Sequence, residues 1–298
     1  MWGTSFLLTK IAVAAIAPID LVAGRFVLGT LALLTVLLVT RRGLPGTARL
    51  WLFIVAIALV GNCLPFLLIT WGQQRIDSGL AGILMAIMPL TTVVLAHVFV
   101  AGERLNRFKA AGFLLGFLGI VVLMGPAVLL ELRGSGAVLL SELAVLGGAV
   151  CYAVNTIIAR RRPESDALVA AAGVSLVACL IMAPASALTG LPDLGRIPAS
   201  ALIAVAILGV VSTATATVVY FKLITLAGPS FLSLINYLIP AWAVLAGMLF
   251  LGERPDWTAL AGLAFILSGI ALAETKGRKF GGDRAGDAIS LDEPNDRP

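Results

Sequence analysis

Charged residues, and the residue types that build catalytic and metal sites, are scarce in this sequence. Only 12% of its 298 residues are charged, it has one histidine, His97, and its three cysteines lie singly in apolar runs. Because soluble proteins carry about 25% charged residues, a water-soluble fold is excluded. The cysteines show no paired spacing, so we expect neither a disulfide framework nor a metal site.

Two further absences narrow the functional class. No apolar run has an Asp or Glu near its middle, and no Gly-Lys-Ser or Gly-Lys-Thr loop occurs. Direct use of ATP is therefore excluded. An intramembrane enzyme needs paired carboxylates, a Ser–His pair or a metal cluster at membrane depth, so we expect no enzymatic activity and no cofactor. The net charge of +5 comes from short basic clusters between apolar runs, which indicates loop anchors and not nucleic-acid binding.

Long apolar stretches dominate the chain instead. Hydrophobic residues make up 60% of it, and a membrane-spanning helix needs ~20 mostly apolar residues. Ten stretches fit: 2–17, 20–40, 50–71, 77–99, 107–130, 138–159, 167–188, 198–221, 229–250 and 257–274. The first contains Lys10 and has no basic segment before it, so it predicts a retained helix and not a signal peptide.

The second half of the chain repeats motifs of the first at nearly constant offset. The matched elements are Pro89 with Pro240, Gly102-Glu103-Arg104 with Gly252-Glu253-Arg254, Gly112 with Gly262, Gly119 with Gly269, and Trp2-Gly3-Thr4-Ser5 with Tyr152-Ala153-Val154-Asn155. Duplicated units of membrane helices are typical of secondary transporters. We predict a first repeat at 1–130, a second repeat at 138–274, and, from its polar composition, a flexible cytoplasmic tail at 275–298.

The distribution of Lys and Arg between alternate loops predicts the orientation. One set of loops, together with the C-terminal stretch, holds nearly all of them, and the other set holds only Arg75, Arg133, Arg196 and Arg254. The positive-inside rule therefore places both termini in the cytoplasm. Because each repeat has five spans, an odd number, the second copy must be inverted. We thus expect an all-α integral membrane fold of ten helices in two inverted five-helix repeats around a central cavity.

These motifs resemble the drug/metabolite transporter superfamily, in its ten-helix branch with two EamA domains. The resemblance rests on Trp-Gly-Thr-Ser-Phe at 2–6, on the Leu-x-x-x-Arg-Phe element that ends at Arg25-Phe26, and on the two Pro…Gly-Glu-Arg segments. It implies a basket of helices around a cavity lined by the first, third, fourth, sixth, eighth and ninth. Within the superfamily the chain is similar to bacterial exporters of amino acids and related metabolites, including aromatic amino-acid exporters of the YddG type.

Pro89 and Pro240 fall inside predicted helices, where each removes a backbone hydrogen bond. Because the feature recurs in both copies, we predict hinges; packing kinks are the alternative. Methionine, aromatic and uncharged polar side chains in the spans are candidates for a solute cavity. They are Ser5, Trp71, Gln73, Gln74, Met85, Met88, Thr92, Tyr152, Asn155, Thr213, Thr217, Tyr220, Ser233, Asn236 and Tyr237. Hydrogen bonding between helices is the alternative reading of the polar ones.

Three titratable side chains in the spans need an explanation. Lys10 lies deep enough to meet a solute carboxylate or an anionic head group, and we add it to the cavity candidates. Arg25 lies less than two turns from a span end, so we expect it to reach the interface near Asp20. His97 also lies near a span end, where an interfacial role is favoured over proton relay.

The sequence therefore predicts a multi-pass transporter of the bacterial inner membrane. We expect it to export amino acids, aromatic ones among them, or similar small metabolites by alternating access. A multidrug or other metabolite exporter of the same fold is the alternative, and a non-transporting receptor or scaffold is the alternative of another class. The expected partners are a small solute and the lipid bilayer. Gly112-x-x-x-Gly116 predicts tight packing against a neighbouring helix or a second copy, so the protein is a monomer or a homodimer.

Overall fold

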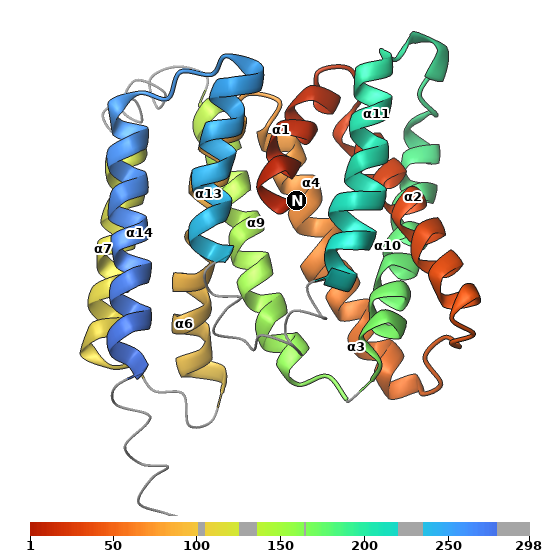
Figure 1. The fold of residues 1–298 in the computed structure, drawn as a ribbon, viewed down its shortest axis with the longest axis horizontal. Helices are drawn as coiled ribbons and strands as arrows, with labels where there is room; N and C mark the ends of the chain where they lie inside the picture. The colour runs from red at the N-terminus through yellow and green to blue at the C-terminus, as the bar shows by residue number, and fades with distance from the viewer. Residues whose placement is uncertain (101–104, 125–135, 164, 220–234, 279–298) are drawn as a thin grey trace, which may run out of the picture.

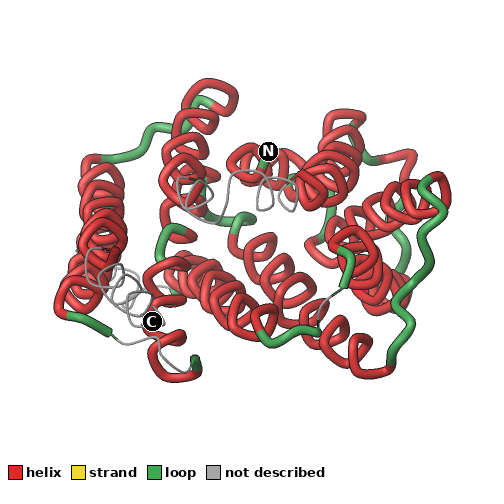
Figure 2. Tube along the Cα trace, turned by 60° about the horizontal axis from the view of Figure 1, so that its bottom comes forward, coloured by secondary structure: helices red, strands yellow, loops and turns green. Residues whose placement is uncertain are grey.

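A computed structural model defines residues 1–100, 105–124, 136–163, 165–219 and 235–278. Of residues 124, 235–237 and 274–278 it defines the backbone only. Every regular element in these ranges is a helix, and Figure 2 shows helices joined by loops with no strand between them.

The first half of the chain contains five helical segments. They are α1 (Trp2–Val13); α2 (Pro18–Val39); α3 (Ala48–Ala58) continued by the π-helix η1 (Leu59–Cys63) and by α4 (Leu64–Gly72); α5 (Ser78–Met85) followed by α6 (Met88–Phe99); and α7 (Arg107–Met124).

The second half contains five more. They are α9 (Ala137–Arg160); α10 (Ala167–Thr189); α11 (Ala199–Ile207), preceded by the short 3₁₀ turn η2 (Leu194–Arg196) and continued by the π-helix η3 (Leu208–Thr215); α13 (Ile235–Ala246), continued by the π-helix η4 (Gly247–Leu251); and α14 (Trp257–Arg278).

These segments confirm the prediction of an all-helical membrane protein. Among the described residues, six helical spans, some of them built of consecutive helical pieces, are long and apolar enough to cross a bilayer: Pro18–Val39, Ala48–Gly72, Ser78–Phe99, Ala137–Arg160, Ala167–Thr189 and Ala199–Val219. Leu238–Leu251 and Trp257–Ala273 are shorter apolar helices. The first helix ends at Val13, before the end of the predicted stretch 2–17, and Pro18 begins α2 because its fixed φ suits a first helical position.

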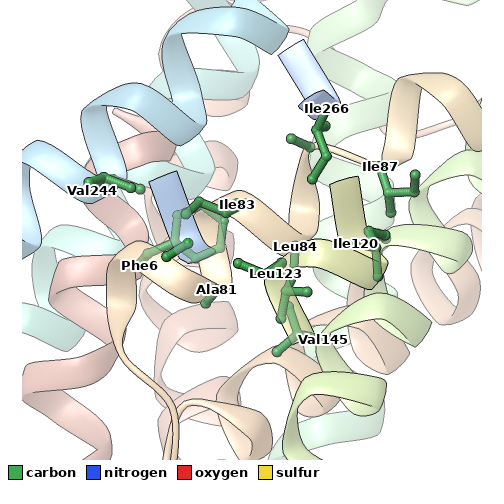
Figure 3. Packing of buried hydrophobic residues seen from close by; sticks show 14 of the residues in the cluster. Phe6, Ala81, Ile83, Leu84, Ile87, Ile120, Leu123, Val145, Val244 and Ile266 are labelled. Carbon is green, nitrogen blue, oxygen red and sulfur yellow. The ribbon is translucent and has the colours of Figure 1, made fainter. Parts of the chain in front are cut away.

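The helices stand side by side in a bundle (Figure 1). α7 and α14 lie together at one end of it, and α2, α3 and α10 lie at the other. The largest buried cluster joins residues from both halves of the chain, with Phe6, Leu84, Val145 and Val244 among them. Figure 3 shows these side chains meeting between the helices, together with Ile120 and Ile266 from the α7–α14 pair.

A seam of glycines joins α7 to α14. A side chain at Gly112 would come within 2.5 Å of the carbonyl oxygen of Gly269, and one at Gly119 within 2.8 Å of the carbonyl oxygen of Gly262. Only glycine lets the two backbones approach this closely. A side chain at Gly116 would overlap Leu90 of α6. The predicted tight packing around Gly112 and Gly116 is therefore confirmed, and the neighbours are helices of the same chain.

The two predicted proline positions differ in structure. Pro240 lies inside α13, as the sequence predicts. Pro89 lies in the first turn of α6, because the fourth segment breaks after Met85. At the break the amides of Ala86 and Ile87 bond carbonyls three residues back, as in a tight turn. The expectation of one kinked fourth helix is thus replaced by two helices, and the hinge role of both prolines stays a prediction.

Candidate functional site

Arg25 of α2 is enclosed between helices from both halves of the chain. Its side chain is 6% exposed. Its Nε donates a hydrogen bond to Thr213 Oγ1 of η3 at 2.7 Å, and its guanidinium carbon lies 3.9 Å from the centre of the Phe66 ring of α4. The Phe66 ring in turn meets Tyr152 of α9 edge-on, with 6.2 Å between ring centres. A cation, two aromatic rings and a hydroxyl therefore converge from four elements.

This placement corrects the expectation that Arg25 reaches the interface near Asp20. Asp20 accepts a hydrogen bond from Ser186 Oγ of α10 at 2.5 Å, and the Arg25 guanidinium turns inward. Within the described residues no carboxylate pairs with Arg25. Its terminal Nη nitrogens likewise make no hydrogen bond to that part of the chain. Among the described residues, the Nη donors of this buried cation are therefore unused.

Two π-helices border this cluster, and polar side chains satisfy their widened backbones. Thr213 Oγ1 donates to the Leu208 carbonyl at 2.9 Å, five residues back, while it accepts from Arg25. Asn62 Nδ2 of η1 makes the equivalent bond to the Ile57 carbonyl at 3.2 Å. π-Helical stretches are rare and occur frequently at functional sites. Sequence periodicity gives no signal for them, so sequence reasoning missed both.

Asn155 of α9 faces the other π-helix, η1. A side chain at Gly61 would overlap the Asn155 carboxamide, so glycine is required for this approach. Asn155 Oδ1 is buried and has no hydrogen-bond partner in the part of the chain that the structure describes. An unsatisfied buried acceptor is costly and needs an explanation. Asn155 lies one turn of α9 away from Tyr152, whose ring belongs to the Arg25 cluster. The two predicted residues of α9 therefore lie close to this cluster.

Lys10 and Gln73 connect α1 to the end of α4. Lys10 Nζ donates to the carbonyls of Gln73 at 3.0 Å and Ile76 at 2.7 Å, which are free because they follow the last turn of α4. Gln73 is fully buried and its Nε2 donates to the Phe6 carbonyl at 2.9 Å, while its Oε1 meets no partner among the described residues. Both predicted cavity residues therefore act at this junction as links between helices.

Glu253 performs a related task at the start of α5. Its Oε1 accepts from the Ser78 amide at 2.7 Å and its Oε2 from the Gly79 amide at 2.9 Å. Gly252, with a φ of +67°, ends η4 in the left-handed conformation, and a side chain at Gly247 would overlap Glu253 Oε2. The second Gly-Glu-Arg motif thus ends the ninth segment and caps the fourth.

Asp77 occupies the N-cap position of α5, but its side chain makes no capping bond there. Burial, and then the negative charge of Glu253, raise the pKa of Asp77, and Lys10 opposes them. The first Gly-Glu-Arg motif falls within residues 101–104, outside the described part of the chain.

The other predicted residues fall into three groups. Met85, Met88 and Tyr152 pack around the largest buried cluster, and the Thr92 and Thr217 hydroxyls bond the carbonyls of Met88 and Thr213. Three predicted residues lie near the ends of helices. The Ser5 hydroxyl donates to the Met1 carbonyl at the start of α1, and at the end of α4 Gln74 is exposed and Trp71 is 38% exposed beside Arg75. Tyr220 and Ser233 lie outside the described residues, and Asn236 and Tyr237 lie in α13 with undescribed side chains. Their roles in a cavity stay predictions.

His97 lies exposed in the last turn of α6, where its Nδ1 accepts from the Leu105 amide at 3.1 Å. This contact agrees with a position at the end of a span. Phe66 and Gly61 are site residues that sequence reasoning missed, because an aromatic residue and a glycine in an apolar run carry no distinctive signal. The charge of Arg25 within a span indicates a functional residue, but helix position alone predicts that its side chain points to the interface, whereas it points into the bundle.

Ten apolar helical segments with polar groups enclosed between them define a multi-pass membrane protein. The sequence profile of the EamA-like transporter family matches residues 1–125 and 139–275. The chain belongs to this family, which lies within the drug/metabolite transporter superfamily and consists of transporters and not of enzymes.

Known relatives cover nearly all of the chain. It is 30% identical to a chloroplastic WAT1-related protein of Arabidopsis thaliana over 91% of its own length and 66% of the plant protein's. It is 26% identical to YedA, an uncharacterized inner membrane transporter of Escherichia coli, over 92% of its own length and 88% of YedA's. A solved crystal structure matches with a TM-score of 0.64 at 23% identity, over 93% of this chain and 97% of that one, which shows the fold.

Proposed function

We propose that the protein is a secondary transporter that exports amino acids, aromatic ones among them, or similar small metabolites by alternating access. In this proposal residues 1–130 and 138–274 form inverted repeats, and the solute path lies in a central cavity between them. The observation that carries the proposal is an exchange of packing partners between the two halves.

Contacts between the halves come in matched pairs: where a segment of the first half packs against a segment of the second, their counterparts in the opposite halves also pack together. The third segment packs against the sixth through α4 and α9, and the eighth packs against the first through α11 and α1. The second packs against the eighth through α2 and η3, and the seventh against the third through α10 and α3. The fourth packs against the sixth through α6 and α9, and the ninth against the first through α13 and α1. A two-fold axis that exchanges the halves produces this pattern.

The glycine seam and the π-helices support the same axis. Gly112 contacts Gly269, and Gly119 contacts Gly262, so matched positions of the two repeats meet in exchanged order and the two helices run antiparallel. The third and eighth segments also turn into π-helices at matched places, at Leu59 and Leu208. Inverted repeats give a transporter two equivalent gates, one at each membrane face, around a site at mid-membrane.

The solute class rests on the side chains gathered between the halves and on the resemblance to amino-acid exporters. Tyr152, Asn155 and Thr213 provide uncharged polar groups and Met85 and Met88 provide flexible apolar surface, which suits small amphipathic solutes. The two methionines also favour the second candidate, a multidrug exporter, because flexible thioethers adapt to many shapes. Saturable transport of amino acids without transport of hydrophobic cations distinguishes the first from the second.

The direct test is transport by purified protein in liposomes loaded with labelled phenylalanine, leucine or other amino acids. We expect saturable efflux down the solute gradient, with little response to an imposed pH difference and unchanged rates in His97→Gln. Failure of every amino acid tested would refute the proposed solute class. Uptake against the solute gradient, driven by pH alone and lost in His97→Gln, would instead make His97 a proton carrier.

The proposed orientation, with both termini in the cytoplasm, has a separate test. Single cysteines replace Arg161 and Asp193, both exposed, in a background without the three native cysteines. An impermeant thiol reagent added outside cells is expected to label position 193 and not position 161. The opposite labelling pattern would contradict the orientation.

A further inference from the structure

The buried guanidinium of Arg25 is not accounted for by the packing of the bundle. Arg25 stands seven residues after Pro18, roughly 10 Å along α2 at ~1.5 Å per residue, within the membrane-spanning helix. Arginine stays charged in proteins, and a charge removed from water is costly unless an opposite charge compensates it. No such charge faces Arg25 in the described part of the chain.

The protein fixes the position of Arg25 and leaves its terminal donors unused. Thr213 holds Nε, and the Phe66 ring covers one face of the guanidinium. The two Nη nitrogens make no hydrogen bond to the described residues, although the side chain is 6% exposed. A planar guanidinium with free Nη donors matches the geometry of a carboxylate, which it binds through two parallel hydrogen bonds.

The surroundings indicate which anion fits. The Phe66 ring lies against the guanidinium, and the rings of Phe26 and Tyr152 flank Phe66, with ring centres 5.5 and 6.2 Å from its own. A phosphorylated solute would need several cations, but Lys10, which also lies deep within a predicted span, is engaged by the carbonyls of Gln73 and Ile76. One cation beside aromatic surface suits a single carboxylate on an apolar or aromatic body.

We propose that Arg25 binds the carboxylate of the exported solute, so that the transporter selects monocarboxylates, free amino acids included, over the corresponding amides. This assignment rests on the proposed transport function and adds the group that the protein recognises. Arg25 contacts residues from α4 and η3, in different halves of the chain. A solute bound at Arg25 therefore lies between the two halves that alternating access moves past each other.

The test compares phenylalanine with phenylalaninamide, and leucine with leucinamide, as competitors of efflux from proteoliposomes. For the wild type we expect each acid to compete at least 10-fold better than its amide. Arg25→Gln is expected to weaken competition by the acids by roughly 10- to 100-fold, the effect of losing charge-assisted hydrogen bonds, and to leave the amides unchanged. Arg25→Lys is expected to fall between, because it keeps the charge and loses the fork.

Arg75→Gln is the matched control. Arg75 also lies over an aromatic ring, with its guanidinium carbon 5.5 Å from the centre of the Trp71 ring, but it is exposed at the end of α4. Its loss is expected to change neither acids nor amides. Wild-type efflux that fails to distinguish acids from amides would overturn the proposal even if Arg25→Gln does not fold. An equal loss of acids and amides in Arg25→Gln would make Arg25 a positioning residue. Absence of amino-acid transport by the wild type would overturn the proposed function itself.

Discussion

The cap that Glu253 places on α5 predicts a large and specific loss of stability on its removal. The carboxylate joins the ninth segment to the fourth through two hydrogen bonds, of 2.7 and 2.9 Å, to the Ser78 and Gly79 amides. Hydrogen bonds to a charged group contribute about 1.5–3 kcal/mol each, and Glu253 is partly exposed, which favours the lower values. We therefore expect Glu253→Ala to lower the free energy of unfolding by about 3 kcal/mol.

A double-mutant cycle with Gly247 tests the geometry behind this number. A side chain at Gly247 would overlap Glu253 Oε2 and displace the carboxylate, so Gly247→Ala is expected to cost about as much as Glu253→Ala. With Glu253→Ala already present, the Gly247 change should cost about 1 kcal/mol or less, which gives a coupling of about 2–3 kcal/mol. Unfolding in mixed micelles, followed by the fluorescence of the five tryptophans, measures all four proteins.

Asp256→Ala is the control for loss of a carboxylate in the same loop. Asp256 caps only its own helix, through the Ala259 amide and the Thr258 hydroxyl, both at 2.8 Å, and Asp256 is exposed. A local cap is worth about 1 kcal/mol, so its loss should be smaller and additive with Gly247→Ala. If the effects of Glu253→Ala and Gly247→Ala also proved additive, the carboxylate would not hold α5 as described.

Three further predictions concern stability, and the first of them also concerns transport. Asn155→Leu removes a buried acceptor without a partner, so thermal stability should stay equal or rise while efflux falls; unchanged efflux would exclude the amide from the solute path. Folding raises the pKa of Asp77, so the ionised carboxylate disfavours the folded state and Asp77→Asn should have the larger free energy of unfolding at pH 7. This stability difference between mutant and wild type should vanish as the pH falls through the pKa of Asp in the unfolded chain, about 3.9. A stability difference that grows at low pH would contradict this sign. Gly269→Leu should separate α7 from α14 and lower the free energy of unfolding by more than about 2 kcal/mol in the same assay. Gly43→Leu, at a position with open space, should leave the free energy of unfolding unchanged. Equal effects of the two changes would show that the seam is not close-packed.

The apolar pattern predicts most of the helices because bilayer thickness sets the length of an apolar run directly. The ten predicted stretches correspond to ten helical segments, and their ends agree within a few residues where the structure describes them. The break near Pro89 and the π-helices were harder to predict. A proline shows that a hydrogen bond is lost but not whether the helix bends or stops, and that choice depends on what packs against the freed carbonyls.

The candidate site depended far more on tertiary contacts. The sequence identified Tyr152, Asn155 and Thr213 as polar groups in spans, yet Thr213 meets Arg25 across 188 positions of the chain. The direction of a long side chain follows from its neighbours, and a choice between the interface and the interior cannot be read from helix position alone. Lys10 shows the same limit, because the carbonyls it contacts, at Gln73 and Ile76, follow the end of a different helix, α4.

By itself, the sequence determined the membrane location and the number and order of the helices, since each follows from local composition, and it predicts the duplication from recurrence along the chain. It also marked the glycines of the close helix pair and the second Gly-Glu-Arg motif. Only the tertiary structure decided what these residues touch: that Gly112 meets Gly269, that Glu253 caps a helix beginning 175 positions earlier, and that Arg25 is buried with no counter-ion among the described residues. Helix formation in a bilayer is a local matter of satisfying backbone hydrogen bonds, whereas the partner of a charge is set by the packing of distant segments.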